Sequence, residues 1–171
     1  MAAIAALNVM ACKKDKDNDE ISGPKTDVPA ELQGNWMYGN FSMTEYWSQN
    51  PSGYIGNAFQ FAIAFKFNSN GTYEQYFTSS SVTAGVSTYQ QSVTKGTVVI
   101  DEVNKTITAY PAKAHYKRTR SGQTLEERDL AKSELRGATT YNYTIGTEPN
   151  GTKAIYLIIQ GDNNPLTFLK K

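Results

Sequence analysis

Apolar and polar positions alternate along most of the chain from residue 58 onward, which predicts β-strands joined by short turns. The clearest stretch is AFQFAIAFKF at 58–67, where every second residue from Phe59 to Phe67 is large and apolar. Asn70-Gly71 follows, a pair typical of tight hairpin turns, and TYEQYFTSSS then continues as a second strand. This region is therefore expected to form a β-hairpin with one apolar face.

The same pattern predicts an all-β domain with eight strands in sequence. Sequential antiparallel strands of this number favour closure into an up-and-down barrel, because closure removes exposed sheet edges. Gly96 indicates a bulge, and Pro111 indicates a bend or an edge, since proline has no N–H for the ladder. The expected strands lie at 33–41, 58–67, 72–81, 87–100, 106–118, 139–146, 152–161 and 165–171.

Two stretches interrupt the alternation. Residues 42–57 form a long polar connection between the first two strands. Further on, Thr124 and Glu127 have the spacing of a helical capping box, leucines and charges follow, and Gly137 suits a helix end. We therefore expect one short helix from about 125 to 136, lying outside the barrel.

The N-terminus has a different composition. Residues 2–11 are almost wholly apolar, and dense charge begins directly after Cys12. The apolar run has a small residue at Ala11 but no basic segment before it, so the start is truncated or misassigned if this is a secretory signal. It is also far shorter than the roughly 20 apolar residues that span a bilayer.

Val9, Met10, Ala11 and Cys12 resemble the lipobox of bacterial lipoproteins. The resemblance implies that 1–11 is a signal peptide and that Cys12 is acylated, with palmitate-type chains holding the protein to the membrane. The alternative is a buried cysteine in a short N-terminal helix. Residues 13–27 are too polar to bury much surface, so 12–27 is interpreted as the lipidated cysteine and a flexible tether, and 28–171 as the folded domain.

The lysine- and acid-rich start of the tether is similar to the surface-export signals of Bacteroidetes lipoproteins. That similarity implies an outer-membrane lipoprotein facing outward. A solvated spacer that leaves the domain in the periplasm is the alternative. Either way, the expected location is the cell envelope.

Composition excludes several classes of function. The net charge of +1 gives no support for nucleic-acid binding, and one cysteine excludes an internal disulfide or a thiolate metal cluster. The single histidine, His115, has no nucleophile motif or second histidine to work with, so we interpret it as a surface residue in a basic strand end. We expect a monomer that is not an enzyme and that uses no cofactor and no metal.

At the first strand, Gly34, Asn35 and Trp36 resemble the Gly-x-Trp motif of the lipocalin family. In that family the tryptophan closes one end of the barrel under a basic residue of the last strand, a role that the resemblance assigns to Lys170 or Lys171. The chain departs from the family in two respects, because its expected helix falls between strands five and six and the usual disulfide is absent. The resemblance implies a lipocalin-like barrel that binds a small hydrophobic ligand.

The long connection 42–57 carries the candidate ligand-binding residues Tyr46, Trp47 and Tyr54. Exposed loop aromatics often mark binding, and a matching loop in lipocalins covers the barrel mouth. The alternative is that these rings plug the mouth as core. An eight-stranded barrel either fills with side chains or holds one small ligand, so a filled interaction or inhibitor module acting through its loops is the competing function.

Overall fold

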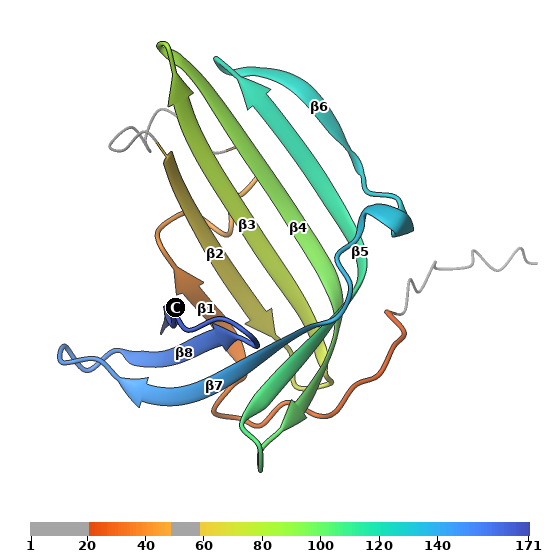
Figure 1. Ribbon diagram of the computed structural model, residues 1–171, viewed down its shortest axis with the longest axis vertical. Helices are drawn as coiled ribbons and strands as arrows, with labels where there is room; N and C mark the ends of the chain where they lie inside the picture. Colours follow the sequence, from red (N-terminus) through yellow and green to blue (C-terminus); the bar gives the residue numbers. More distant parts are fainter. Residues whose placement is uncertain (1–20, 49–58) are drawn as a thin grey trace, which may run out of the picture.

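The computed structural model describes residues 21–48 and 59–171, and this part of the chain is nearly all β-structure (Figure 1). A short 3₁₀-helix, η2 (Lys132–Glu134), lies between two of the strands. The strands are β1 (Gly34–Tyr38), β2 (Phe59–Phe67), β3 (Thr72–Thr83), β4 (Val86–Asp101), β5 (Thr106–Arg120), β6 (Gln123–Asp129), β7 (Thr139–Thr147), β8 (Lys153–Ile159) and β9 (Leu166–Lys170).

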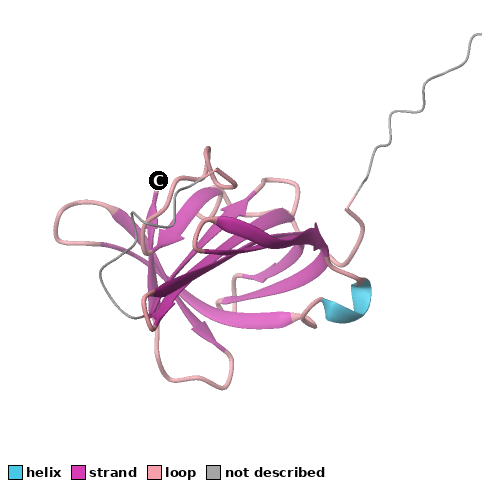
Figure 2. Cartoon of the chain, turned by 90° about the horizontal axis from the view of Figure 1, so that it is seen from above, coloured by secondary structure: helices cyan, strands magenta, loops and turns pink. Residues whose placement is uncertain are grey.

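The described strands form one antiparallel sheet in the order β4-β3-β2-β1-β9-β8-β7-β5-β6, and pairing of β4 with β5 closes it into a ring (Figure 2). The ring passes through every described strand except β6, which pairs with β5 at its side. All eight strands expected from the alternation are present at nearly the expected bounds. The all-β prediction is therefore confirmed, with β6 as an additional strand.

Strand β5 changes partner along its length. Thr106–Ala109 pair with β7, and His115–Arg120 pair with β6. Pro111 falls between these two stretches, and the β4–β5 register shifts between Lys95 and Gly96. The bulge at Gly96 is thus confirmed, and Pro111 lies at an edge as predicted, because it pairs with Gly96 of β4 on one side and with neither β6 nor β7 on the other. They let the long strands extend beyond the ring, as the upper part of Figure 1 shows.

The predicted helix over 125–136 is wrong, because this stretch begins as strand β6 and becomes helical only in η2. Ser121 and Gly122 both have positive φ, 47° and 80°, which makes the two-residue turn of a tight hairpin. Glu127, whose spacing from Thr124 suits a capping box, instead lies 3.4 Å from the Lys117 ammonium of β5. Opposite charges across the hairpin favour the strand over the helix.

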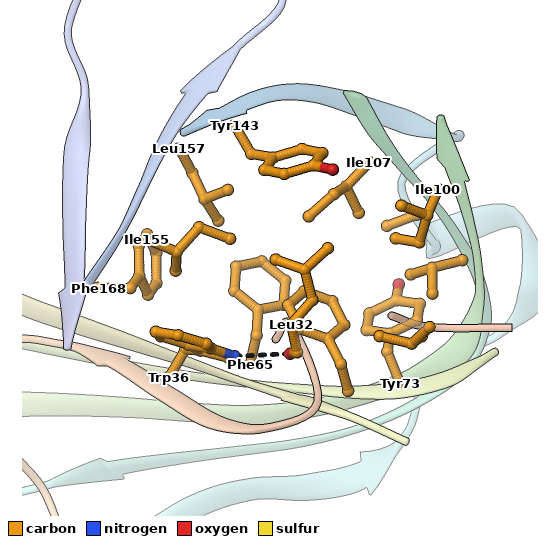
Figure 3. Packing of buried hydrophobic residues seen from close by; sticks show 14 residues of the cluster. Leu32, Trp36, Phe65, Tyr73, Ile100, Ile107, Tyr143, Ile155, Leu157 and Phe168 are labelled. Atoms are coloured by element: carbon orange, nitrogen blue, oxygen red, sulfur yellow. Dashed lines mark hydrogen bonds between the residues drawn. The ribbon is translucent and has the colours of Figure 1, made fainter. Parts of the chain in front are cut away.

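The main core fills one end of the ring (Figure 3). Trp36, Leu32 and Ile155 have no exposed surface, and Phe65 stacks on Phe67 with ring centroids 5.4 Å apart. Leu32 lies in the segment before β1, which passes along this end of the ring (Figure 1). The described side chains therefore pack the interior at this end of the ring.

The folded region starts slightly before the boundary expected at residue 28. The Thr26 N–H donates to the Val98 carbonyl at 3.1 Å, and the Thr26 hydroxyl accepts a hydrogen bond from the Ile100 N–H at 2.8 Å. The end of the predicted tether is thus fixed along β4. Residues 1–20, which include the rest of the tether and Cys12, lie outside the described residues.

A second, smaller core lies on the outer face of the sheet. Alternation along β2 sends Phe65 into the main core and Ala62 and Ala64 to the opposite face, where the covering segment 41–48 packs over them. Ala64 has no exposed surface and Tyr46 has 3%. The small side chains of β2 therefore leave room for the aromatic rings of the covering segment.

Candidate functional site

A cavity of about 380 Å³ lies beside the main core, at the end of the ring from which β3, β4 and β5 extend. Tyr73, Gln75 and Phe77 alternate along β3 toward this interior, and Tyr73 is part of the core below. The cavity has an apolar floor and a polar wall. We name it the ring cavity. The lining residues are Ile63, Tyr73, Gln75, Phe77, Ser92, Thr94, Ala109, Pro111, Ala114, Leu130, Glu134, Leu135, Arg136, Gly137, Thr139 and Tyr141.

The two sides of the ring cavity differ in chemistry. Ile63, Phe77 and Tyr141 offer apolar and aromatic surface, whereas Ser92 and Thr94 of β4 offer hydroxyl groups. Hydroxyls both donate and accept hydrogen bonds. The cavity can therefore hold a molecule with an apolar part and a polar part.

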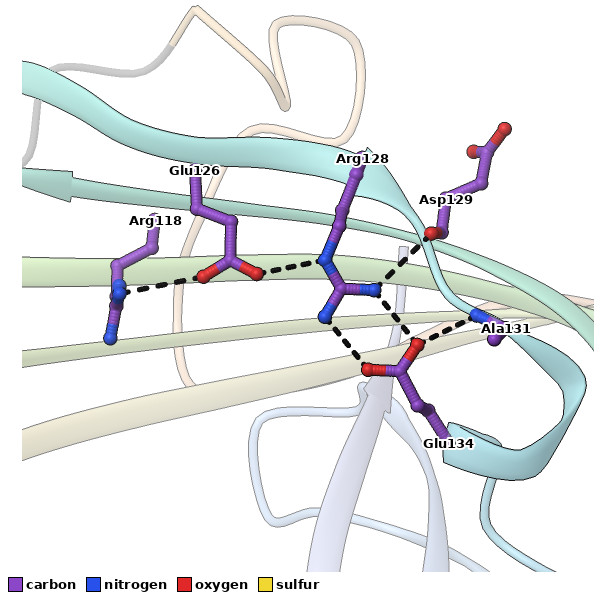
Figure 4. Close-up of polar contacts among 6 residues, drawn as sticks. All are labelled: Arg118, Glu126, Arg128, Asp129, Ala131 and Glu134. Carbon is purple, nitrogen blue, oxygen red and sulfur yellow. Dashed lines mark hydrogen bonds and ion pairs between the residues drawn. The ribbon is translucent and has the colours of Figure 1, made fainter.

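The segment between β6 and β7 borders the ring cavity and is held by a row of alternating charges (Figure 4). This ion-pair chain runs from Arg118 through Glu126 and Arg128 to Glu134. Arg128 donates to both oxygens of Glu134, at 2.8 and 2.7 Å, and the Ala131 N–H donates to the same carboxylate at 2.8 Å.

The hydrogen bonds from Arg128, followed by the one from Ala131, lower the pKa of the Glu134 carboxyl to about 2. Glu134 therefore stays ionised over the physiological pH range. The segment beside the cavity is fixed to β6 under these conditions.

The residues of the Gly-x-Trp motif meet Lys170 at one end of the core. The Trp36 indole N–H donates to the Leu32 carbonyl at 2.7 Å (Figure 3), and the Lys170 ammonium lies 4.4 Å from the Trp36 ring centroid. Lys170 also donates to the Gln33 carbonyl, and burial lowers its pKa. Gly34 has φ 95°, and a Cβ there would lie 3.1 Å from the Lys170 ammonium. Of the two lysines considered, Lys170 thus takes the position over the tryptophan.

The two predicted ligand-binding aromatics that the structure describes, Tyr46 and Trp47, do not line the ring cavity. Tyr46 is buried on the outer face, where its hydroxyl donates to the Ser92 carbonyl at 2.9 Å and to the Phe77 carbonyl. Trp47 is half-buried, and its ring contacts His115 edge to face with centroids 4.9 Å apart. Tyr54 lies outside the described residues. The burial of Tyr46 fits the alternative that these rings act as core.

Trp47 borders a second, larger hollow of about 780 Å³ on the outside of the sheet, which we name the outer groove. The covering segment forms one side, and β3, β4, β5 and the end of β6 form the rest. The lining residues are Met43, Thr44, Glu45, Tyr46, Trp47, Ser48, Glu74, Tyr76, Val93, Lys95, Lys113, Ala114, His115, Asp129 and Leu130.

His115 is held on the surface by neighbouring acids. Its Nδ1 lies 2.8 Å from an oxygen of Asp129, and its Nε2 lies 3.7 Å from Glu127. The described residues contain no group of three histidine, cysteine, aspartate or glutamate side chains arranged for a metal ion. They also form no helix that is both long and apolar enough to cross a membrane.

Sequence reasoning missed the residues of the ring cavity. Gln75, Ser92 and Thr94 occupy inward positions of strands where a packed core would place apolar residues. These polar residues are the sequence signal for a cavity. The signal can be recognised only when it is known which face of each strand points inward. Arg136 and Glu134 were missed because this stretch was expected to be helical.

No family model, curated protein or solved structure matches this chain.

Proposed function

We propose that this chain is a lipid-anchored protein of the bacterial cell envelope whose domain is a lipocalin-like barrel that binds a small amphipathic ligand without catalysis. The ring cavity carries the proposal. Its volume of about 380 Å³ is at the lower end of the range for small-molecule sites, and barrel mouths are a common place for such sites.

The ring of antiparallel strands and the position of Lys170 over Trp36 support the lipocalin-like interpretation. The sequence alone suggested a largely apolar ligand. The hydroxyls of Ser92 and Thr94 favour a ligand that also carries a polar group. Because the main core packs one end of the ring, the ligand would lie beside that core, in the ring cavity.

Binding would come from burial of apolar ligand surface against Ile63, Phe77 and Tyr141. Each stretch of about 100 Å² of buried apolar area contributes about 2.5 kcal/mol before the entropic costs of association are subtracted. The polar wall would orient the ligand, since an unpaired polar group in the cavity would be costly.

A matched pair of variants on β7 tests the proposal. Thr139 lines the ring cavity, whereas Thr144 is exposed, so Thr139→Phe adds a ring inside the cavity and Thr144→Phe adds the same ring outside it. The probe is N-phenylnaphthylamine, which fluoresces in apolar surroundings. The wild type and Thr144→Phe should take it up, and Thr139→Phe should bind it about tenfold more weakly or worse, a loss of about 1.4 kcal/mol.

The filled core at one end of the ring favours a second candidate, an interaction or inhibitor module that acts through its loops. If none of the three proteins takes up the probe, the ring cavity is not a ligand site and this second function is supported. Equal uptake by Thr139→Phe and the wild type would also contradict binding in the ring cavity.

The lipid anchor has a separate test. The full chain, expressed in a bacterial host fed with an alkyne analogue of palmitate, should incorporate the label and remain with the membranes. Cys12→Ser should lose both the label and the membrane association. Labelling that persists in Cys12→Ser would contradict the lipobox interpretation.

A further inference from the structure

The outer groove is separate from the ring cavity, because the two lie on opposite faces of the same sheet. Tyr73, Gln75 and Phe77 point into the ring, whereas Glu74 and Tyr76 of the same strand line the groove. The two linings share Ala114 and Leu130. The groove has about twice the volume of the ring cavity, about 780 Å³ against about 380 Å³. The function proposed above does not use it.

An aromatic side chain is held at a fixed position beside this groove. Trp47 contacts the rings of Tyr46 and His115 edge to face, each with centroids 4.9 Å apart. Tyr46 is itself anchored by its hydroxyl to the backbone of β3 and β4. Trp47 remains half-buried, so part of the indole surface is available to a ligand at little cost in side-chain entropy.

Several polar groups of the outer groove are paired with one another. The Glu74 carboxylate accepts a hydrogen bond from the Tyr76 hydroxyl at 2.7 Å and lies 3.7 Å from the Lys95 ammonium. Burial disfavours its charge, but the Tyr76 hydrogen bond and then the lysines lower the pKa of Glu74 below its ordinary value. On the other side, His115 is bonded to Asp129.

This pairing leaves the groove with little net charge. Its lining carries three acids, two lysines and one histidine. An ionic ligand would therefore gain little electrostatic attraction. A ligand with many hydroxyl groups suits it better, because hydroxyls can donate to the carboxylates and accept from the ammonium groups without adding charge.

We propose that the outer groove binds a neutral saccharide. One sugar ring lies with its C–H face against the indole of Trp47, and its hydroxyls bond to Glu74, Lys95 and His115. A saccharide combines an apolar face with a dense set of donors and acceptors, which are the two kinds of surface that the groove presents. This site does not depend on the ring cavity or on the ligand proposed there.

Calorimetric titration of the full chain carrying Cys12→Ser tests the proposal, with maltotriose, xylotriose and chitotriose as neutral probes and trigalacturonate as an anionic one. At least one neutral trisaccharide should bind saturably and should shift tryptophan fluorescence. The sequence has two tryptophans, and Trp36 has no exposed surface, so the shift reports Trp47. Trp47→Ala should abolish binding.

Two further variants keep the outcome interpretable. Trp47→Phe retains an aromatic ring against Tyr46 and His115 and should weaken binding by about tenfold. Thr139→Phe fills the ring cavity and should leave saccharide binding unchanged. The proposal is overturned if none of the neutral probes binds, if trigalacturonate binds more tightly than they do, or if binding survives Trp47→Ala. Loss of binding in Thr139→Phe would place the saccharide in the ring cavity instead.

Discussion

Replacement of Trp36 by phenylalanine removes a buried hydrogen bond, weakens a cation–π contact and leaves unfilled space at the closed end of the core. Trp36 has no exposed surface, its indole N–H donates to the Leu32 carbonyl at 2.7 Å, and the Lys170 ammonium lies 4.4 Å from its ring centroid. Phenylalanine keeps an aromatic ring but has no donor and a smaller face. The change therefore separates the contribution of the indole from that of a generic buried ring.

The expected cost can be estimated from these contacts. Leaving the Leu32 carbonyl without its buried partner costs about 1–3 kcal/mol. The contact between Lys170 and the indole contributes about 0.5–1 kcal/mol, and a smaller ring loses part of this contribution. The space left by the indole adds to the loss. A total of about 2–4 kcal/mol should lower the Tm by roughly 5–15 °C for a chain of this length.

Urea unfolding followed by circular dichroism measures the loss directly. A double-mutant cycle with Lys170→Met, which keeps most of the aliphatic stem, should give a coupling of up to about 0.5–1 kcal/mol between the two positions. Trp47→Phe serves as the control, because Trp47 is only half-buried and should lose less. A loss below about 0.5 kcal/mol for Trp36→Phe, the usual range for surface changes, would show that the indole contributes no more than a generic ring at this position.

Three further predictions test other parts of the structure. Gly96→Ala would place a Cβ 2.0 Å from a carbonyl oxygen of β5, so urea unfolding should show a loss of about 1–3 kcal/mol, whereas Gly137→Ala meets nothing within 4 Å and should be near neutral. Ala64→Phe should displace the covering segment 41–48 and change tryptophan fluorescence; an unchanged spectrum would contradict its placement. The pKa of Glu134 is lowered from 4.5 to about 2, so its contribution to stability is complete above about pH 4.5 and is lost as pH falls toward 2. An NMR titration midpoint near 4.5 would contradict the ion-pair chain.

Alternation was enough to predict the strands, because a period of two is hard to confuse with a helix over nine residues such as Phe59–Phe67. It failed at 125–136, where the spacing of Thr124 and Glu127 fits both a capping box and a charged edge strand. What decides is the partner strand: Lys117 and Arg118 lie opposite the acids of β6. The Ser121-Gly122 pair was the local signal for the hairpin.

The candidate site was harder to predict than the fold. Aromatic residues at Tyr46 and Trp47 do mark a hollow, but the sequence could not tell whether their segment covers the mouth or the outer face. The covering segment lies on the outer face because the small side chains of Ala62 and Ala64 leave room for it to pack there. The ring cavity depends on polar residues that point inward, and alternation gives no sign of which face is inside.

Whether the ring cavity holds a ligand can be read from native mass spectrometry of the full chain, extracted in mild detergent from the envelope of its own host. We expect a bound species with a mass on the order of a few hundred daltons, as expected for a cavity of about 380 Å³, in addition to the lipid on Cys12. That mass should disappear on denaturation, persist in Thr144→Phe and be absent from Thr139→Phe. A wild-type chain that carries only its lipid, or a bound mass that survives in Thr139→Phe, would contradict a ligand in the ring cavity.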